Sequence, residues 1–306
     1  MISRGDRERL PIAVLLSRIR FEEKQILAEL DRRYVPFEVV DARRAAFRLD
    51  RLDRNDAPWT GAVVREISHN RGLYAAHILE HAGLRVVNAA RAIAVCGDKL
   101  LTTMALCRAG LPVPRTIATL TPEAALDALD SFGYPAVVKP LVGSWGRMVA
   151  RLNDRDAAEA VLGHRAALPD PRQRITYVQE YIDKPGRDIR GLVIGGEAVG
   201  AVYRISADWR SGTARGARTM PCRLTEELAG LLTAAARTVG DGVYGIDLIE
   251  DGDGGLRVNE INHTPEFHGA AEVLDLDIAG RYVDYLVRSL RTPPDTSAGA
   301  ADGERT

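Results

Sequence analysis

The sequence has few cysteines, no segment typical of a signal peptide and no long hydrophobic run. Its three cysteines, Cys96, Cys107 and Cys222, form no CxxC spacing among 306 residues, which argues against a disulfide framework or a thiolate metal site. The N-terminal stretch is charged, and no apolar run approaches the roughly 20 residues of a membrane span. We therefore expect reduced thiols and a cytoplasmic protein that does not enter a membrane.

A strong charge of either sign is also lacking. The formal net charge of −1 excludes a general electrostatic attraction to nucleic acid. The charge is uneven, however, because residues 1–97 contain 17 basic and 13 acidic residues, whereas the remainder contain 24 and 29. A mildly basic first third favours an acidic partner, although ordinary solvated surfaces would have the same composition.

Lysine is scarce among the basic residues. Only four of the 41 are lysines, namely Lys24, Lys99, Lys139 and Lys184. A compact ammonium binds phosphate as a point charge, and a guanidinium fork does not replace it. Lys99 and Lys139 are therefore candidates for phosphate binding, whereas Lys24 lies in a stretch typical of a surface.

The first part of the chain alternates short apolar strands with helices. Strands are expected at residues 12–16, 35–40, 62–64 and 85–88, with helices at 22–33 and 72–82. This order predicts an open parallel sheet covered on both faces. Further along, Thr121, Asp154 and Thr225 are expected to cap the N-termini of three helices. The last helix is expected at 278–290, and the small, polar residues 292–306 are expected to be disordered.

The most informative segment, residues 245–262, reads as two apolar strands joined by an Asp/Gly-rich turn. Glu260 and Asn262 are two residues apart, so they share one face of a strand. Folding the hairpin about its turn brings Asp247 opposite Glu260. Three oxygen ligands on a rigid sheet suit Mg²⁺, which proteins hold by one or two carboxylates together with substrate phosphates. A hairpin with solvated acids is the competing interpretation, but Asp and Asn are poor strand residues.

Lys139 ends a second informative strand, Pro135-Ala-Val-Val-Lys139. In the segment after it, Val142-Gly-Ser-Trp-Gly-Arg147, the two glycines predict a flexible loop whose N–H groups could cover phosphates. It is not a Walker A motif, and a plain hairpin turn would look the same. Downstream, residues 178–182 could offer backbone groups to an adenine and Asp188 a carboxylate to a ribose. Alone, that segment is only a strand with a Pro-Gly turn.

Together these pieces resemble the ATP-grasp superfamily, and within it the RimK-type carboxylate–amine ligases, most closely the LysX ligases of carrier-protein-dependent lysine biosynthesis. The resemblance covers roughly residues 65–285. It is carried by the following stretches: Cys96-Gly-Asp-Lys99, Gly110-Leu-Pro-Val-Pro114, Phe132-Gly-Tyr-Pro135, Val138-Lys-Pro140, Gly143-Ser-Trp-Gly-Arg147, Gln179-Glu-Tyr-Ile182, Lys184-Pro-Gly-Arg-Asp-Ile-Arg190, Thr213-Ala-Arg-Gly216 and Val258-Asn-Glu-Ile-Asn-His-Thr264 with Glu266-Phe267.

The resemblance implies an α/β protein, α+β in its C-terminal part. An ATP-grasp fold would follow an N-terminal pre-ATP-grasp domain built on an open parallel sheet. The implied parts are the N-terminal domain at 1–97, a central subdomain at 98–178, a C-terminal subdomain at 179–291 and a tail at 292–306.

The resemblance also implies residue roles, with Glu180 and Ile182 at the adenine edge and Asp188 at the ribose. The residues implied in ATP binding are Lys99, Lys139, Ser144, Glu180, Ile182, Asp188, Arg210 and Ser211. Those implied in holding Mg²⁺, of which two ions are expected, are Asp247, Glu260 and Asn262. Those implied at the amino-acid substrate are Ser68, Arg71, Gly72, Arg190, Thr213, Arg215, His263 and Thr264. Lys139 and Arg215 are the implied catalytic residues.

The implied reaction has two steps. ATP phosphorylates a carboxylate, and an amine then attacks the acyl phosphate, with Arg215 stabilising the tetrahedral oxyanion. The glycine-flanked Ser144-Trp145 loop is the candidate lid against water. In the LysX relatives, the carboxylate is the side chain of a C-terminal Glu on a small acidic carrier protein, and the amine belongs to α-aminoadipate. Relatives suggest a homodimer or homotetramer.

Two departures bear on the identity of the amino acid. Gly212 stands where relatives have Asn before Thr-Ala-Arg-Gly, with Arg218 nearby, and Pro265 falls inside the substrate-side loop. We therefore expect α-aminoadipate or a related, modified amino acid. Two alternatives stay open: a RimK-type glutamate or peptide ligase acting on another protein or peptide, and an ATP-binding module without ligase activity.

Overall fold

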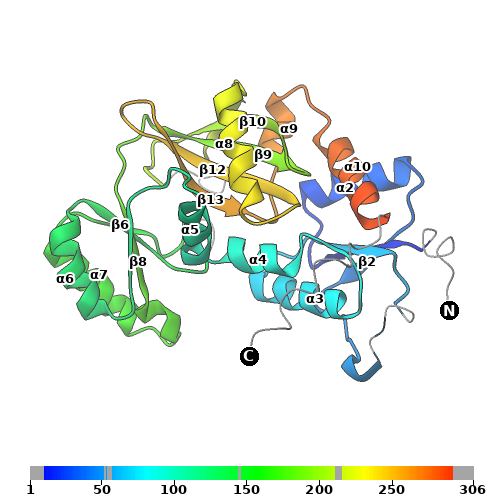
Figure 1. Cartoon of the computed structure of the whole chain (residues 1–306), viewed down its shortest axis with the longest axis horizontal. Helices are drawn as coiled ribbons and strands as arrows, with labels where there is room; N and C mark the ends of the chain where they lie inside the picture. The colour runs from blue at the N-terminus through cyan, green and yellow to red at the C-terminus, as the bar shows by residue number, and fades with distance from the viewer. Residues whose placement is uncertain (1–9, 52, 54–56, 144–145, 211–215, 292–306) are drawn as a thin grey trace. The chain divides into compact units, whose positions relative to one another are not determined.

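The computed structural model describes the chain except residues 1–9, 52, 54–56, 144–145, 211–215 and 292–306 (Figure 1). The chain divides into two compact units: Met1–Ala90 with Ala279–Thr306, and Arg91–Ile278. The sequence-based boundaries at 97/98 and 178/179 stay a prediction, and the predicted disordered tail lies outside the described residues. No helix in the described part is long and apolar enough to cross a bilayer.

The first unit is built on a four-stranded parallel sheet in the order β2-β1-β3-β4, which confirms the predicted parallel arrangement. Every residue of β1 and β3 is buried, as expected for strands covered on both faces. The elements of this unit are β1 (Ile12–Leu16), α2 (Phe21–Arg32), β2 (Phe37–Asp41), η1 (Leu49–Arg51), β3 (Gly61–Val64), α3 (His69–His81), β4 (Val86–Val87) and α10 (Ile278–Arg291). Helix α10 packs in this unit, where Asp284 forms an ion pair with Arg33 and Leu290 packs against Gly61.

The second unit contains two sheets, of which the smaller has the order β5-β8-β6-β7 and is antiparallel. Its elements are α4 (Ala90–Gly97), α5 (Lys99–Arg108), β5 (Thr116–Thr119), α6 (Pro122–Phe132), β6 (Ala136–Lys139), β7 (Ala150–Leu152), α7 (Arg155–Ala166), η2 (Pro171–Arg174) and β8 (Thr176–Glu180). Leu129 of α6 and Leu162 of α7 pack on Val138 and Val178 to form its core. The predicted caps are confirmed, because Thr121 accepts from Ala124 N and Asp154 from Ala157 N.

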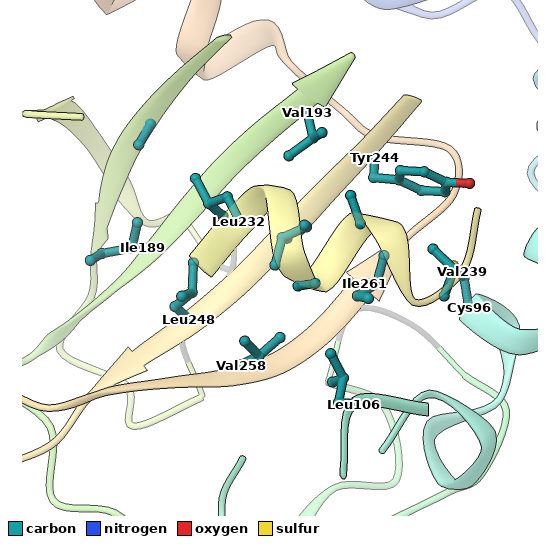
Figure 2. Close-up of a cluster of buried hydrophobic side chains, with 14 of the residues drawn as sticks. Cys96, Leu106, Ile189, Val193, Leu232, Val239, Tyr244, Leu248, Val258 and Ile261 are labelled. Atoms are coloured by element: carbon teal, nitrogen blue, oxygen red, sulfur yellow. The ribbon is translucent and has the colours of Figure 1, made fainter. Parts of the chain in front are cut away.

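The larger sheet has the order β11-β10-β9-β12-β13 and is antiparallel throughout. Its elements are β9 (Arg187–Ile194), β10 (Glu197–Ile205), β11 (Arg218–Cys222), α8 (Glu226–Arg237), β12 (Val243–Glu250), β13 (Leu256–Asn262) and α9 (His268–Val273). Helix α8 lies along one face, where Leu232 packs among Ile189, Val193 and Leu248 (Figure 2). The register pairs Asp247 with Glu260, so the predicted hairpin is confirmed.

Helices α4 and α9, strands β5 and β11 and the short helices η1 and η2 were not predicted. Helix α4 is short and apolar, so its sequence resembles a linker segment between a strand and a helix. Strand β5, Thr-Ile-Ala-Thr, has only four residues. Strand β11 contains Pro221, a residue that argues against a strand unless the strand lies at an edge of its sheet, as β11 does.

Candidate active site

A row of charged side chains crosses the larger sheet on the face opposite α8. In a strand, alternate residues point to opposite faces. Because Ile189 and Leu248 face α8, Asp188 and Arg190 of β9 and Asp247 of β12 point the other way. The cross-strand register places Arg190 opposite Asp247, and Asp247 opposite Glu260 of β13. One face therefore forms the core, and the other supplies ionisable groups.

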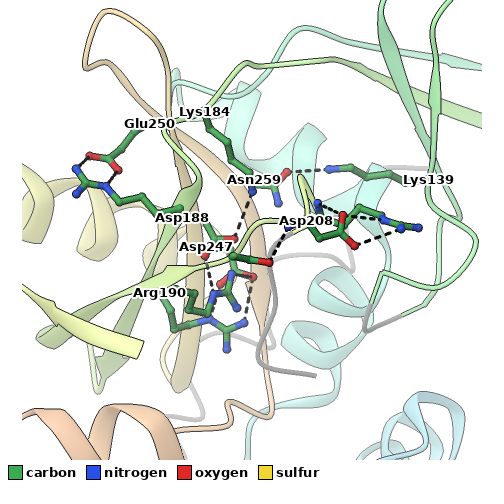
Figure 3. A network of polar contacts seen from close by, with 12 residues as sticks. Lys139, Lys184, Asp188, Arg190, Asp208, Asp247, Glu250 and Asn259 are labelled. Atoms are coloured by element: carbon green, nitrogen blue, oxygen red, sulfur yellow. Dashed lines mark hydrogen bonds and ion pairs between the residues drawn. The ribbon is translucent and has the colours of Figure 1, made fainter. Parts of the chain in front are cut away.

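Asp247 lies at the centre of a buried ion-pair network (Figure 3). Its carboxylate accepts hydrogen bonds from Arg190 Nε and, at 3.0 Å, from Arg190 Nη2. Arg204 Nη2 of β10 lies 3.1 Å away from it, and Arg204 Nε donates to Asp188 Oδ1 at 2.7 Å. Lys184 Nζ lies 3.8 Å from Asp188 Oδ2. Asp188, Arg204 and Asp247 are each at most 8% exposed.

These contacts set the protonation of the network. Burial by itself would raise the pKa of Asp247, but the Arg190 and Arg204 guanidinium groups outweigh burial and lower it. Burial likewise opposes the charge on Arg204, whose pKa is nevertheless raised by Asp247 and Asp188. Burial also lowers the pKa of Lys184. The Asp247 carboxylate is therefore ionised and held by the two arginines.

The two lysines selected from the sequence both reach β13. Lys139, at the end of β6, donates from Nζ to the side-chain oxygens of Gln179 and, at 2.8 Å, Asn259. Lys99, the first residue of α5, donates to Gly143 O at 2.8 Å and lies 3.7 Å from Glu260 Oε2. Burial lowers the pKa of Lys139 to about 8, and the positive charge of Lys99 contributes to the same shift.

The predicted metal ligands share the polar face of the β12–β13 hairpin. Asn262 Nδ2 donates to Gly245 O at 3.3 Å, which leaves its Oδ1 directed elsewhere and without a partner in the described part of the chain. The oxygen donors of Glu260 and Asn262 suit Mg²⁺. The described residues contain no group of three or more His, Cys, Asp and Glu side chains able to hold a metal. An ion here would therefore draw further ligands from phosphate, and Asp247 would have to exchange arginine contacts for it.

The residues predicted at the adenine and ribose are occupied by protein contacts. Glu180 accepts from Arg115 N at 2.8 Å and from Arg115 Nε at 2.7 Å, so its carboxylate binds this arginine. Burial raises the pKa of Glu180, but the bonds to Arg115 outweigh it and lower the pKa. Ile182 lies two residues after the end of β8, and Asp188 belongs to the buried network. Their nucleotide roles stay predictions.

Ser68, Arg71 and Gly72 belong to the first unit, where they surround a carboxylate that the sequence did not single out. Glu66 Oε1 accepts from Ser68 N at 2.8 Å and from Arg71 Nη2 at 2.9 Å. Ser17 Oγ, which follows β1, donates to the same oxygen at 3.0 Å. Glu66 is 2% exposed. An acid two residues after the buried strand β3 was the available signal.

The remaining predicted residues lie at the edges of this site or outside the described chain. Arg210 is paired with Asp208 at 3.2 Å, and its guanidinium lies over the ring of Trp209. His263 Nδ1 and Thr264 Oγ1 are 2.9 Å apart. Four predicted residues lie outside the described residues, namely Ser144, Ser211, Thr213 and Arg215.

Arg204, Gln179 and Asn259 contact the central groups of the site but were not selected from the sequence. Arg204 interrupts an otherwise apolar stretch of β10, which is a signal that could have been used. Gln179 and Asn259 had no such signal, because polar residues near strand ends are common. Their proximity to Lys139 depends on two sheets meeting.

Family models cover nearly the whole described chain. Residues 96–286 match the RimK-like ATP-grasp domain, and residues 12–95 match the LysX preATP-grasp domain. These matches agree with the resemblance drawn from the sequence motifs.

Two curated relatives are similar over most of their length. The glutamate–LysW ligase ArgX of Sulfurisphaera tokodaii is 33% identical over 278 residues, which cover 90% of this chain and 97% of that protein. The alpha-aminoadipate–LysW ligase LysX of Sulfolobus acidocaldarius is 34% identical over 277 residues, which cover 89% and 98%. Both are named as ligases of an amino acid and LysW.

A solved structure shares the fold. The RimK domain ATP-grasp protein from Sphaerobacter thermophilus has a TM-score of 0.73 and 25% sequence identity, with 90% of this chain and 98% of that chain covered. The predicted ATP-grasp fold is thus confirmed. With two lysines directed at a polar strand face, and with family models matching both of its parts, this chain belongs to the RimK-like ATP-grasp family of ATP-dependent carboxylate–amine ligases.

Proposed function

We propose that this ligase joins the amino group of an amino acid to the side-chain carboxylate of the C-terminal Glu of a small, acidic, LysW-like carrier protein. Two relatives named as LysW ligases, each matching about nine-tenths of the chain, support this acceptor. One of these relatives is named for glutamate and the other for alpha-aminoadipate. We therefore propose α-aminoadipate, glutamate or a related amino acid as the amine donor.

The observation that carries the ATP-dependent chemistry is the excess of positive charge at the polar face. Five cations converge there with three carboxylates, and one of the cations, Lys139, forms no ion pair with the described residues and donates to two neutral amide oxygens. The cations are Lys99, Lys139, Lys184, Arg190 and Arg204, and the carboxylates are Asp188, Asp247 and Glu260. A buried ammonium held by neutral oxygens favours an anionic ligand, and a polyphosphate supplies both negative charge and oxygen acceptors.

The residues of the site then have distinct tasks. Lys99 and Lys139 would contact the phosphates and hold the γ-phosphoryl in line with the acceptor carboxylate. Glu260 and Asn262, together with Asp247, would hold Mg²⁺, which when bound neutralises charge on the phosphates; we propose two such ions. The amine would then attack the acyl phosphate, with Arg215 stabilising the oxyanion and the Ser144-Trp145 loop excluding water.

The direct test measures the product on the carrier. A LysW carrier protein with a C-terminal Glu is incubated with the ligase, ATP, Mg²⁺ and either glutamate or α-aminoadipate, and its intact mass is determined. We expect a mass increase of one amino acid less one water, with stoichiometric ADP. The same mixture with Lys139→Ala should leave the carrier unmodified.

Acceptor specificity separates this proposal from its main competitor. The enzyme could use free glutamate or short peptides as efficiently as the carrier, or it could modify a peptide and leave the carrier unmodified. Either result would show a RimK-type peptide ligase and contradict the carrier ligase. Removing the terminal Glu of the carrier should abolish the reaction. The assembly state, which we propose to be a homodimer or homotetramer, is measured by light scattering.

A further inference from the structure

Strand β13 contains an irregularity at the site. Asp247 is paired with Glu260, but the next residue along β12, Leu248, is paired with Val258. Asn259 therefore has no partner across the ladder and is the extra residue of a β-bulge. Val258 and Ile261 both lie in the core under α8. Between them, two consecutive residues, Asn259 and Glu260, point away from the core.

The bulge gives each phosphate lysine a partner on the same strand. Asn259 Oδ1 accepts a hydrogen bond of 2.8 Å from Lys139 Nζ, although the two residues are 120 positions apart and belong to different sheets (Figure 3). Glu260 lies 3.7 Å from Lys99 Nζ. In a regular strand, residues 259 and 260 would point to opposite faces, and only one lysine could be contacted.

The second acceptor for Lys139 is held in a fixed orientation. Gln179 Nε2 donates to Tyr177 OH at 2.7 Å and to Thr116 Oγ1 at 3.3 Å. Tyr177 OH is in turn bonded to Thr103 Oγ1 of α5 at 2.7 Å. Since both Gln179 and Tyr177 are at most 2% exposed, this network determines which end of the amide meets the lysine. The Gln179 side-chain oxygen, rather than its nitrogen, faces Lys139.

We propose that Asn259 and Gln179 are positioning residues that hold the Lys139 ammonium ready for a nucleotide phosphate before the nucleotide binds. This inference rests on the proposed role of Lys139 in ATP binding. A lysine side chain has high rotamer entropy, and ordering it beforehand reduces what phosphate binding must pay. An ammonium has three N–H donors. Two are used here, and no described residue accepts the third.

The chemical type of the two acceptors matters as much as their position. Both are neutral amide oxygens, so they orient the cation without cancelling its charge. A carboxylate at either position would form an ion pair with Lys139, compete with the phosphate for the ammonium and repel the phosphate itself. The site thus combines a fixed direction for the ammonium with acceptors that carry no negative charge.

The test measures ADP affinity by calorimetry for Asn259→Ala, Asn259→Asp and Gln179→Met, each in the wild-type and in the Lys139→Ala background. Asn153→Ala is the matched control, because Asn153 is exposed and lies between β7 and α7. Loss of a hydrogen bond to a charged group should weaken ADP binding about 10-fold in Asn259→Ala and in Gln179→Met. The nearly isosteric Asn259→Asp should weaken it further.

The double variants distinguish positioning from a general structural role. If Asn259 acts through Lys139, Asn259→Ala should have no further effect on ADP affinity once Lys139 is Ala. A structural role would lower affinity equally in both backgrounds and would overturn the inference. Asn259→Asp retains the shape of the side chain and can be measured if Asn259→Ala fails to fold. Wild-type ADP affinity in Asn259→Asp would also overturn the inference.

These outcomes are separable from a failure of the proposed function. If Lys139→Ala alone leaves ADP affinity unchanged, Lys139 does not bind the diphosphate and the inference fails. If that variant also keeps full ligase turnover, the proposed nucleotide site fails with it. If Lys139→Ala weakens binding but Asn259→Ala and Gln179→Met both bind as the wild type does, only the positioning inference fails.

Discussion

The two faces of the β11–β10–β9–β12–β13 sheet share one backbone, but one face carries apolar side chains and the other carries charged side chains. On one face, Ile189, Val193 and Leu248 pack against Leu232 of α8. On the other, Arg190 and Asp247, which alternate with those residues along the same strands, form an ion pair. Stability and binding therefore come from interleaved positions. Substitutions on one face should change the free energy of unfolding, and those on the other should change turnover.

The largest expected effect is on the polar face. Replacing Glu260 by Ala removes a predicted metal ligand, and because a metal ion contributes several kcal/mol to phosphoryl transfer, we expect amino-acid-dependent ADP release to fall about 10³-fold. The urea concentration at the midpoint of unfolding should be the same as that of the wild type. A coupled ADP assay and a urea titration check both, and full turnover in this variant would refute the metal site.

A core substitution should give the opposite pattern. Leu232 is 0% exposed and lies at the centre of the contact between α8 and the sheet. Leu232→Ala removes buried methyl groups and leaves a cavity, which costs about 2–5 kcal/mol of the free energy of unfolding. Urea unfolding measures this loss. The ADP affinity of the folded protein should be unchanged, and a large loss of affinity would show that the two faces are coupled.

The close approach of α8 to β9 offers a finer version of the same comparison. A Cβ added at Gly191 would overlap the end of the Leu232 side chain. We expect Gly191→Ala to destabilise the protein by about 1–3 kcal/mol through overpacking. Combining it with Leu232→Ala should cost less than the two single changes together, because the overlapping atoms are then absent.

The control for this substitution lies on the same helix. Gly230 of α8 is exposed, and a Cβ there would meet nothing within 4 Å. Gly230→Ala should therefore stabilise the protein by about 0.5–1 kcal/mol through helix propensity. Chemical denaturation of the two Gly→Ala variants should give opposite signs, and equal signs would contradict the packing geometry.

A dependence on pH is also expected. The pKa of Lys139 is lowered from 10.5 to about 8, so between these values the unfolded chain binds a proton that the folded chain has released. The contribution of Lys139 to stability should therefore rise with pH across this window, while its charge, and with it ADP affinity, falls. Calorimetry from pH 7 to about pH 9 measures the affinity. In Lys139→Arg the side chain stays protonated, so ADP affinity should no longer fall between pH 7 and about pH 9.

Much of the site's local framework was predictable from the sequence because it depends on short-range rules. The period of two along β12 and β13 and the turn between them placed Asp247 opposite Glu260, as the register confirms. The scarcity of lysine singled out Lys99 and Lys139. The parts that were missed are those in which distant segments meet, such as Arg204 with Asp247 and Asn259 with Lys139. The placement of α10 in the first unit was also not predicted, because an amphipathic sequence does not show which surface the helix covers.

By itself, the amino-acid sequence determined which residues could share a strand face, where helices begin, and which rare cations are suited to phosphate. Those properties follow from backbone geometry and side-chain chemistry within a few residues. Only the tertiary structure decided which charges neutralise one another and which stay available for a ligand. A single extra residue in β13 turned Asn259 toward a lysine from another sheet, and the energy of such a contact exists only once both sheets are folded.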